Sequence, residues 1–121
     1  MASVDVCLAT WQASDQRPDP IELLEQQNTN RLPWLIAERH RRMAQSPFAW
    51  FRGSAAVMAR DLGSRPNSGL TVQLCGDAHL LNFGFYASPE RTLVFDINDF
   101  DETFPGPWEW DLKRLLVSLV L

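Results

Sequence analysis

Apolar residues in the first half of the chain recur every three or four positions, as is typical of amphipathic helices. Residues 1–17 lack this period, and we expect them to form a loose segment. The sequence DPIE at 19–22 predicts a helix start, because Asp can cap a helix and Pro fits its first turn. A second helix is predicted to begin near Pro33, and a third is predicted over 46–63. Gly53 inside the third helix indicates either a close neighbour or a later start.

The second half of the chain changes to strand-like segments separated by turn residues. Residues 70–75 (LTVQLC) predict a strand, and 83–97 predict a hairpin with a Pro-containing turn at 88–91. The sequence FPGP at 104–107 is interpreted as a breaker, after which a last helix begins near Trp108. The leucines of that helix predict a buried stripe made of Leu112, Leu115, Leu116 and Leu119. Helices, a hairpin and a final helix together predict an α+β fold.

The composition indicates a folded protein and excludes several classes. Apolar residues make up 45% of the 121 positions and charged residues 21%, which is typical of a globular domain. The net charge of −4 argues against a nucleic-acid partner. Cys7 and Cys75 lie far apart, and we expect free thiols in a reducing cytoplasm. The chain shows no leader peptide, and its last apolar run is too short to span a membrane.

Polar residues gather in three clusters that the predicted hairpin can bring together. The first cluster, within CGDAHLLNFG at 75–84, follows a strand. The clusters are Asp77, His79 and Asn82; then Asp96, Asn98, Asp99, Asp101 and Glu102; then Glu109 and Asp111. Because the hairpin returns the chain, the second cluster is expected beside the first. Carboxylate and amide oxygens in such a set suit Mg²⁺, whereas one His and one Cys do not make a closed zinc site.

Phosphoryl transfer fits this set of residues. A kinase-type loop needs an Asp that accepts a hydroxyl proton, followed by an Asn on the metal, and a second Asp after a short hairpin. Two other interpretations use the same residues. One is a binding or regulatory module without turnover, and the other is a metal-dependent phosphohydrolase that uses water as its nucleophile.

Three short motifs carry a resemblance to known kinases. CGDAHLLN at 75–82 resembles the H-G-D-x-H-x-x-N loop of aminoglycoside phosphotransferases and choline-kinase-like enzymes. NDFDE at 98–102 resembles their I-D-F-D-D segment, and Asp111-Leu112 resembles the D-L pair that opens their next helix. The longer segments RM-x-x-SPFAWFRG, CGDAHLLNFG, ASPER-x-LVFDINDFDET and PGPWEWDLKRL resemble an uncharacterised bacterial family, domain-of-unknown-function family 2252, from about residue 19 to 121. The resemblance implies a partial protein-kinase-like domain over 18–121.

The resemblance also implies roles for single residues. Asp77 would be the catalytic base, and His79, the second catalytic candidate, would brace the loop or help to bind phosphate. Asn82 would hold Mg²⁺, and ATP would be the phosphoryl donor. Asp111 would support the loop by accepting hydrogen bonds from its backbone.

Three further points stay open at this stage. Asp99 is the preferred second metal ligand because of its D-F-D context, and Asp96, after an apolar pair, is the alternative. Arg52 lies among aromatic residues and is a candidate for a phosphate or carboxylate contact. Cys75 occupies the first loop position, where the kinases have His. Phe48, Trp50 and Phe51 are the aromatic neighbours of Arg52.

The nucleotide-binding half of a kinase is not recognisable in this sequence. The chain has six glycines, no G-x-G-x-x-G, and one lysine, Lys113, after the motifs. It stops at Leu121 inside a run with helical spacing, so we expect a fragment of a longer protein. We therefore expect the chain alone to be inactive as a kinase. Its expected partners are a hydroxyl-bearing acceptor and the missing downstream half of the domain.

Overall fold

The structure is a computed structural model that describes residues 14–121. Of the segment expected to be loose, residues 1–13 lie outside the described residues, and so does Cys7. Arg17 forms a two-pronged ion pair with Asp61, at nitrogen–oxygen distances of 2.7 and 2.6 Å. This pair ties the chain just before the first helix to a later helix.

Four helices form the first half of the described chain: α1 (Pro20–Asn28), α2 (Pro33–Met43), α3 (Pro47–Gly53) and α4 (Ala55–Gly63). The predicted starts of α1 and α2 are confirmed, and the Asp19 side chain caps α1 by accepting from the amide of Ile21. The single helix predicted over 46–63 is wrong, because the backbone leaves helical geometry at Ser54, with φ −117° and ψ 31°. A Cβ on Gly53 would lie 2.5 Å from the Met43 side chain, so the glycine lets α3 cross close to α2.

The segment FPGP, interpreted above as a breaker, is instead a strand. β1 (Thr71–Leu74) pairs antiparallel with β4 (Phe104–Pro107), with Thr71 opposite Pro107 and Gln73 opposite Pro105. The error has a physical reason: proline lacks only the amide donor, so it is compatible with an edge strand, and both strands of this sheet are edges.

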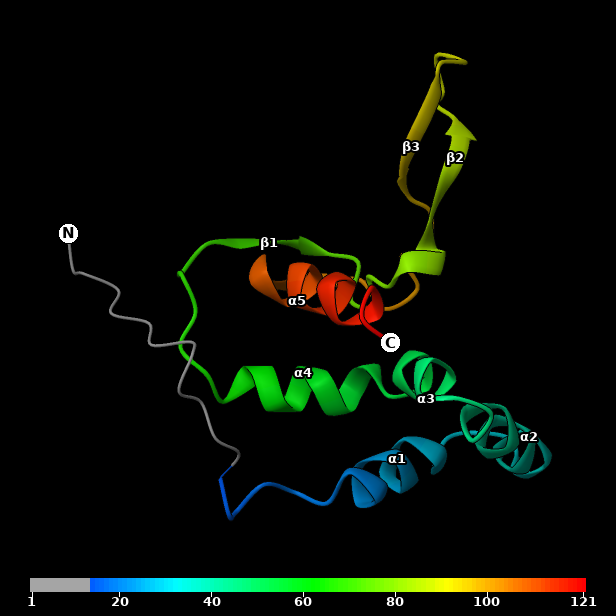
Figure 1. The fold of residues 1–121 in the computed structure, drawn as a ribbon, viewed down its shortest axis with the longest axis vertical. Helices are drawn as coiled ribbons and strands as arrows, with labels where there is room; N and C mark the ends of the chain where they lie inside the picture. The colour runs from blue at the N-terminus through cyan, green and yellow to red at the C-terminus, as the bar shows by residue number, and fades with distance from the viewer. Residues whose placement is uncertain (1–13) are drawn as a thin grey trace.

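The predicted hairpin is confirmed. The short helix η2 (Leu80–Asn82) leads into β2 (Phe83–Ala87), which pairs antiparallel with β3 (Leu93–Ile97). The amide of Arg91 donates to the carbonyl of Ser88 at 2.8 Å, which closes the turn. Figure 1 shows this hairpin projecting away from the rest of the molecule.

The final helix is present, but the prediction of its buried face is wrong. α5 (Glu109–Ser118) begins directly after Trp108. Leu112 is 40% exposed and Leu116 is 52% exposed, whereas Arg114 is 3% exposed. The helix turns its polar face inward because that face satisfies donors and acceptors of the loop after β1, as described below.

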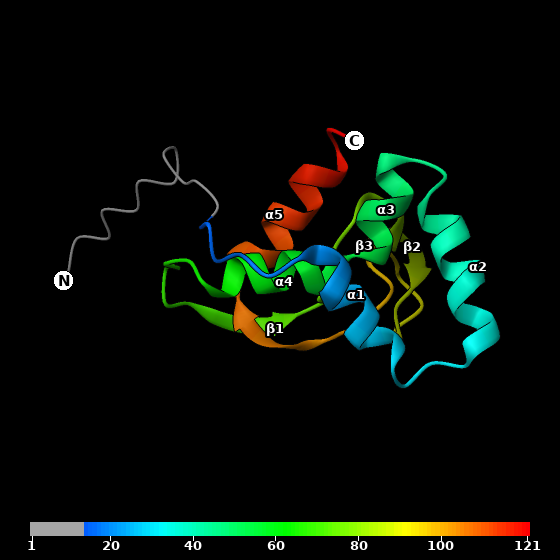
Figure 2. The ribbon, with the colours of Figure 1, turned by 90° about the horizontal axis from the view of Figure 1, so that it is seen from below.

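The described chain is a mixed α+β arrangement of five helices and two small antiparallel sheets. Helices α1 to α4 lie on one side, and α5 lies over α4 together with β1 and β4 (Figures 1 and 2). Leu24, Met43 and Val57 form a small apolar core among α1, α2 and α4. Within residues 14–121, no helix has both the length and the apolar character needed to cross a membrane.

Candidate functional site

The loop that follows β1 packs tightly against the loop that follows β3. Gly76 has φ +88°, and a Cβ there would lie 2.1 Å from the backbone oxygen of Glu102, so only glycine fits without a shift. The Thr103 hydroxyl donates to the Leu74 carbonyl at 2.6 Å, and the Cys75 thiol donates to the Asp99 carbonyl at 3.1 Å. The expected approach of the first two polar clusters is therefore confirmed.

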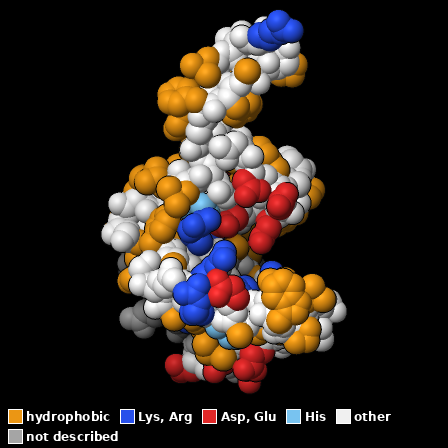
Figure 3. All heavy atoms as spheres, turned by 90° about the vertical axis from the view of Figure 1, so that its right-hand side faces the viewer, with side chains coloured by type: hydrophobic (Ala, Val, Ile, Leu, Met, Phe, Trp, Pro, Cys, Tyr) orange, Lys and Arg blue, Asp and Glu red, His pale blue; other side chains and the backbone are white. Residues whose placement is uncertain are grey.

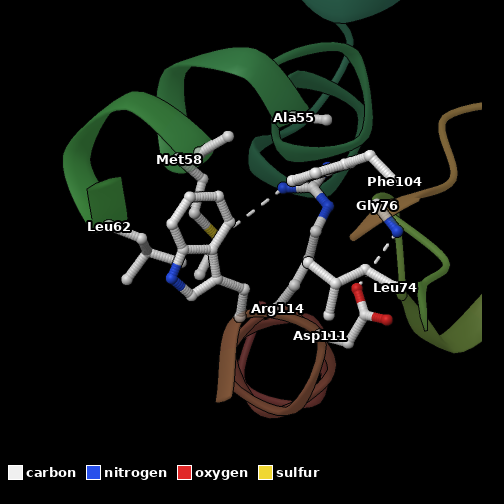
Figure 4. Close-up of a pocket in the computed structure, with 10 residues that line it drawn as sticks. Ala55, Met58, Leu62, Leu74, Gly76, Phe104, Asp111 and Arg114 are labelled. Atoms are coloured by element: carbon white, nitrogen blue, oxygen red, sulfur yellow. Dashed lines mark hydrogen bonds between the residues drawn. The ribbon is translucent and has the colours of Figure 1, made fainter. Parts of the chain in front are cut away.

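Asp111 holds the start of the loop from the first turn of α5. Its carboxylate accepts hydrogen bonds from the amide of Cys75 at 2.7 Å and from the amide of Gly76 at 3.1 Å. The two carboxylate oxygens take one amide each, which fixes both the loop and the rotation of α5. In Figure 4 the Asp111 side chain points from the helix toward Gly76.

Asp77 lies in an ion pair with a residue that the sequence did not single out. The Arg114 Nε donates to Asp77 Oδ1 at 2.5 Å, and the Arg114 side chain is 3% exposed. Its Nη2 donates to the Phe51 carbonyl at 2.8 Å, and its guanidinium lies 4.2 Å from the centre of the Phe51 ring. Figure 4 shows Arg114 extending from α5 toward Met58 on α4. The available signal was the three-residue spacing from Asp111, which places both side chains on one helix face.

His79 is buried between Asp77 and Arg52. The Arg52 Nε donates to His79 Nε2 at 3.2 Å, and Asp77 Oδ2 lies 3.6 Å from the same nitrogen. Among the described residues, the buried Nδ1 has no hydrogen-bond partner, and the Phe48 ring packs edge-on at a centroid distance of 6.0 Å. Burial lowers the pKa of His79 and outweighs the raising effect of the Asp77 carboxylate, while Arg52 and Arg114 lower it further, so the neutral ring is favoured.

Asn82 is locked to the backbone of Asp77. Its Nδ2 donates to the Asp77 carbonyl at 2.9 Å, and its own carbonyl accepts from the amide of Asn98 at 2.9 Å. Within the described residues, the side-chain oxygen of Asn82 accepts no hydrogen bond. Asn82 is 8% exposed, so this unpaired oxygen belongs to a largely buried side chain.

Asp99 and Asp96 occupy different places. Burial raises the pKa of the Cys75 thiol to about 11, and the thiol donates to the backbone carbonyl of Asp99 at 3.1 Å. Asp96 lies on β3 opposite Gly84, and its carboxylate accepts from the amide of its neighbour Ile97. The structure thus brings the backbone of Asp99 against Cys75 in the loop after β1, whereas Asp96 lies on β3.

A cleft opens beside Asp77, between α2 and α3, with a volume of about 540 Å³. Arg52, singled out from the sequence, lies on its wall. Four arginines line the cleft, and we call it the arginine cleft: Arg31, Arg39, Arg42 and Arg52. Within the cleft, Arg39 donates to Asn28, Gln27 and the Gly53 carbonyl.

The metal implied by the kinase resemblance can be compared with these side chains. Among residues 14–121, no three His, Cys, Asp or Glu side chains converge in a way that could hold a metal. The oxygens of Asn82 and Asp99 are hard ligands of the type that Mg²⁺ prefers, and Mg²⁺ commonly takes few protein ligands with water and phosphate completing its shell. By chemical type, the side-chain oxygens of Asn82 and Asp99 are thus the ones that would contribute to such a shell.

Comparison with known proteins identifies a family but no function. The family described as "Uncharacterized protein conserved in bacteria (DUF2252)" matches residues 31–121. No curated protein and no solved structure matches the chain. Because the matched region is most of the chain and includes every site residue described above, the protein belongs to the uncharacterised bacterial family DUF2252.

Proposed function

We propose that this chain carries the catalytic loop and the metal-binding loop of a kinase-like phosphotransferase. The observation that carries the proposal is the link between Asp77 and Asn82. The Asn82 Nδ2 donates to the Asp77 backbone at 2.9 Å, which leaves the amide oxygen free and fixes it relative to the proposed base. Kinase-type loops need an acid and an amide in such a fixed relation.

The surroundings of Asp77 suit a positioned general base. Its Oδ1 is held by Arg114 at 2.5 Å, while Oδ2 lies 3.6 Å from His79 Nε2, and Asp77 lines the arginine cleft. With one oxygen anchored, the other is the one that can accept a proton from an acceptor hydroxyl. His79 and Asp111 would act as positioning residues. His79 lies beside the Asp77 carboxylate, and Asp111 accepts from the amide of Cys75 at the start of the loop.

Magnesium and ATP belong to the proposal. Asn82 and Asp99 would hold the ion, which when bound neutralises charge on the transferred phosphate. Asp99 is favoured over Asp96 because its backbone carbonyl accepts from the Cys75 thiol at the start of the catalytic loop. Arg52 is a candidate contact for an anionic group of a bound ligand.

A second function, a binding module without turnover, is favoured by one observation. The same short contact that positions Asp77 also pairs its carboxylate with a buried guanidinium, which is the arrangement of a structural ion pair. The absence of a recognisable Gly-rich loop in the sequence points in the same direction. The two functions share the metal site and differ in turnover.

Nucleotide-dependent Mn²⁺ binding tests the proposal. Mn²⁺ replaces Mg²⁺ in many sites, and its binding is followed by water-proton relaxation in the presence of ATP. We expect the wild-type chain to bind Mn²⁺–ATP, Asn82→Ala and Asp99→Asn to bind at least about tenfold more weakly, and Asp96→Asn to bind as wild type.

Each other outcome has a distinct meaning. No nucleotide-dependent Mn²⁺ binding by the wild-type chain would overturn the proposal. Loss of Mn²⁺–ATP binding in Asp96→Asn but not in Asp99→Asn would assign the metal ligand to Asp96 on β3. Binding without ATP turnover is the expected result for this chain alone, and turnover that Asp77→Ala abolishes would show that no further sequence is needed. Release of phosphate from a simple ester without nucleotide would favour a phosphohydrolase.

A further inference from the structure

We propose that the arginine cleft binds the acceptor, and that the acceptor is a small anionic molecule carrying a phosphate group and a free hydroxyl. This inference rests on the proposed phosphotransferase function, because it assigns the acceptor side of that site. It is carried by the charge of the cleft, by the way its arginines are held, and by its position at Asp77.

The charge of the cleft is positive and only partly compensated. Two carboxylates, Glu38 and Asp77, line it together with the four arginines. Glu38 already pairs with Arg42, at 2.6 Å, and with Arg41, at 2.8 Å. Of these two arginines, only Arg42 lines the cleft. Figure 3 shows basic side chains gathered on this face next to acidic ones, below the projecting hairpin.

One arginine of the cleft, Arg39, is held in place before any ligand binds. Arg39 is fixed by three acceptors, the nearest being the Gly53 carbonyl at 2.7 Å, and its pKa is lowered by burial and by the positive charge of Arg31. Two guanidiniums that repel each other in the absence of an anion attract one between them. Because Met43 packs directly on Gly53, α2 and α3 keep this spacing. Such pre-organised guanidiniums suit phosphate.

Donors remain free for a ligand. Arg52 uses its Nε on His79, and within the described residues its two terminal nitrogens donate to no other group. The side chain of Arg31 likewise makes no hydrogen bond or ion pair to any described residue, and it is exposed. A phosphate bound by Arg31 and Arg52 would therefore gain donors without breaking existing contacts.

The cleft lies on the acceptor side of the proposed site. His79 Nε2 is the shared neighbour of Arg52, at 3.2 Å, and of Asp77 Oδ2, at 3.6 Å. A molecule whose phosphate lies on Arg52 can thus present a hydroxyl to Asp77. The two residues proposed to hold the metal, Asn82 and Asp99, do not line the cleft. The cleft is therefore distinct from the place proposed for the metal and the nucleotide phosphates.

The sign of the charge distinguishes this acceptor from the polycationic aminoglycosides. An aminoglycoside would meet four guanidiniums and be repelled, whereas a phosphorylated alcohol is attracted. A volume of about 540 Å³ is within the range of small-molecule sites.

Calorimetric titration at low salt tests the inference with three probes: glycerol 3-phosphate, Mn²⁺–ATP and kanamycin. We expect glycerol 3-phosphate to bind the wild-type chain and kanamycin not to bind. Arg31→Gln and Arg52→Gln should each weaken glycerol 3-phosphate binding about tenfold, the effect of losing one charged hydrogen bond. Arg60→Gln removes the same charge from an exposed position on α4 outside the cleft and should change binding less than about twofold.

The nucleotide titration separates the two proposals. Mn²⁺–ATP binding should persist in Arg31→Gln, and glycerol 3-phosphate binding should persist in Asp99→Asn. If the wild-type chain binds glycerol 3-phosphate but not Mn²⁺–ATP, the result would count against the phosphotransferase function and so against the acceptor role of the cleft. Loss of both ligands in Arg31→Gln, with mutual competition, would make the cleft the nucleotide site and overturn the inference. Absence of glycerol 3-phosphate binding, or equal weakening in Arg60→Gln, would also overturn it.

Discussion

The ion pair between Asp77 and Arg114 should be the most sensitive electrostatic contact of the site. Arg114 is 3% exposed, and it reaches Asp77 at 2.5 Å and the Phe51 carbonyl at 2.8 Å. Asp77 keeps 21% of its side-chain surface exposed. The two partners therefore differ in how well water can replace the lost contact, and the two single substitutions should differ in cost.

The magnitudes follow from this asymmetry. Asp77→Asn leaves a buried guanidinium without its counter-charge, which costs about 3–5 kcal/mol of unfolding free energy. Arg114→Met keeps the apolar stem and leaves a carboxylate that water can reach, so we expect a loss of about 2 kcal/mol. In the double variant neither charge remains, and the coupling energy should be at least about 1.5 kcal/mol.

Urea denaturation followed by circular dichroism measures the four free energies of this double-mutant cycle. Arg60→Met, on the exposed surface of α4, is the control for loss of a guanidinium and should change stability by no more than about 0.5 kcal/mol. Additive losses in the double variant would refute the reasoning. A cost for Asp77→Asn smaller than that of Arg114→Met would refute the assigned asymmetry.

Three further predictions concern the same loop. Gly76→Ala should lower the free energy of unfolding in urea much more than Gly69→Ala. Both glycines have positive φ, which costs alanine about 1–2 kcal/mol, but only at position 76 would the added Cβ lie 2.1 Å from a backbone oxygen. Equal losses of stability in the two variants would contradict this. Because burial lowers the pKa of His79, the unfolded chain takes up a proton first, so stability should fall as the pH drops below about 6.5; His79→Gln should flatten that decline in pH-dependent denaturation, and an unchanged slope would exclude His79 as its source. With its pKa raised to about 11, Cys75 in a Cys7→Ser background should react with iodoacetamide at pH 8 far more slowly than in the urea-unfolded chain, as mass spectrometry would show, and equal rates would argue against the buried thiol.

Local signals in the sequence were enough for most of the secondary structure. Asp19 and Ser46 cap helices whose first residue is Pro, and both side-chain bonds are present. The hairpin follows from apolar residues on both sides of a Pro turn, and the two strands pair as an antiparallel hairpin. These features depend on neighbours within a few residues, and such neighbours can be read from the chain.

Features that depend on distant partners were not predictable in the same way. The Pro-rich segment of β4 becomes a strand only because β1 lies beside it, more than 30 residues earlier. The inward face of α5 is polar because Asp111 and Arg114 meet the loop at 75–77, and leucine spacing alone pointed to the opposite face. Periodicity shows that a helix has an apolar face, but it does not show whether that face is covered in this chain.

The candidate site shows the same division. Motif spacing placed Asp77, Asn82 and Asp111 in one region, and their side chains do converge on one loop. Arg114 was missed because a buried arginine next to an acid looks, in sequence, like any helix-surface cation. The arginine cleft was missed because its members come from α2, α3 and the turn before α2, which only the crossing at Gly53 brings together.

The most direct test of the central claim is to locate a bound Mn²⁺–ATP complex by nuclear magnetic resonance. In a ¹⁵N-labelled chain, paramagnetic broadening falls steeply with distance from the ion. Our account predicts that the side-chain amide of Asn82 and the backbone amide of Asp99 broaden first, while the hairpin tip at 88–91 stays sharp. Broadening centred on another group of carboxylates, with the Asn82 signal unaffected, would contradict the account.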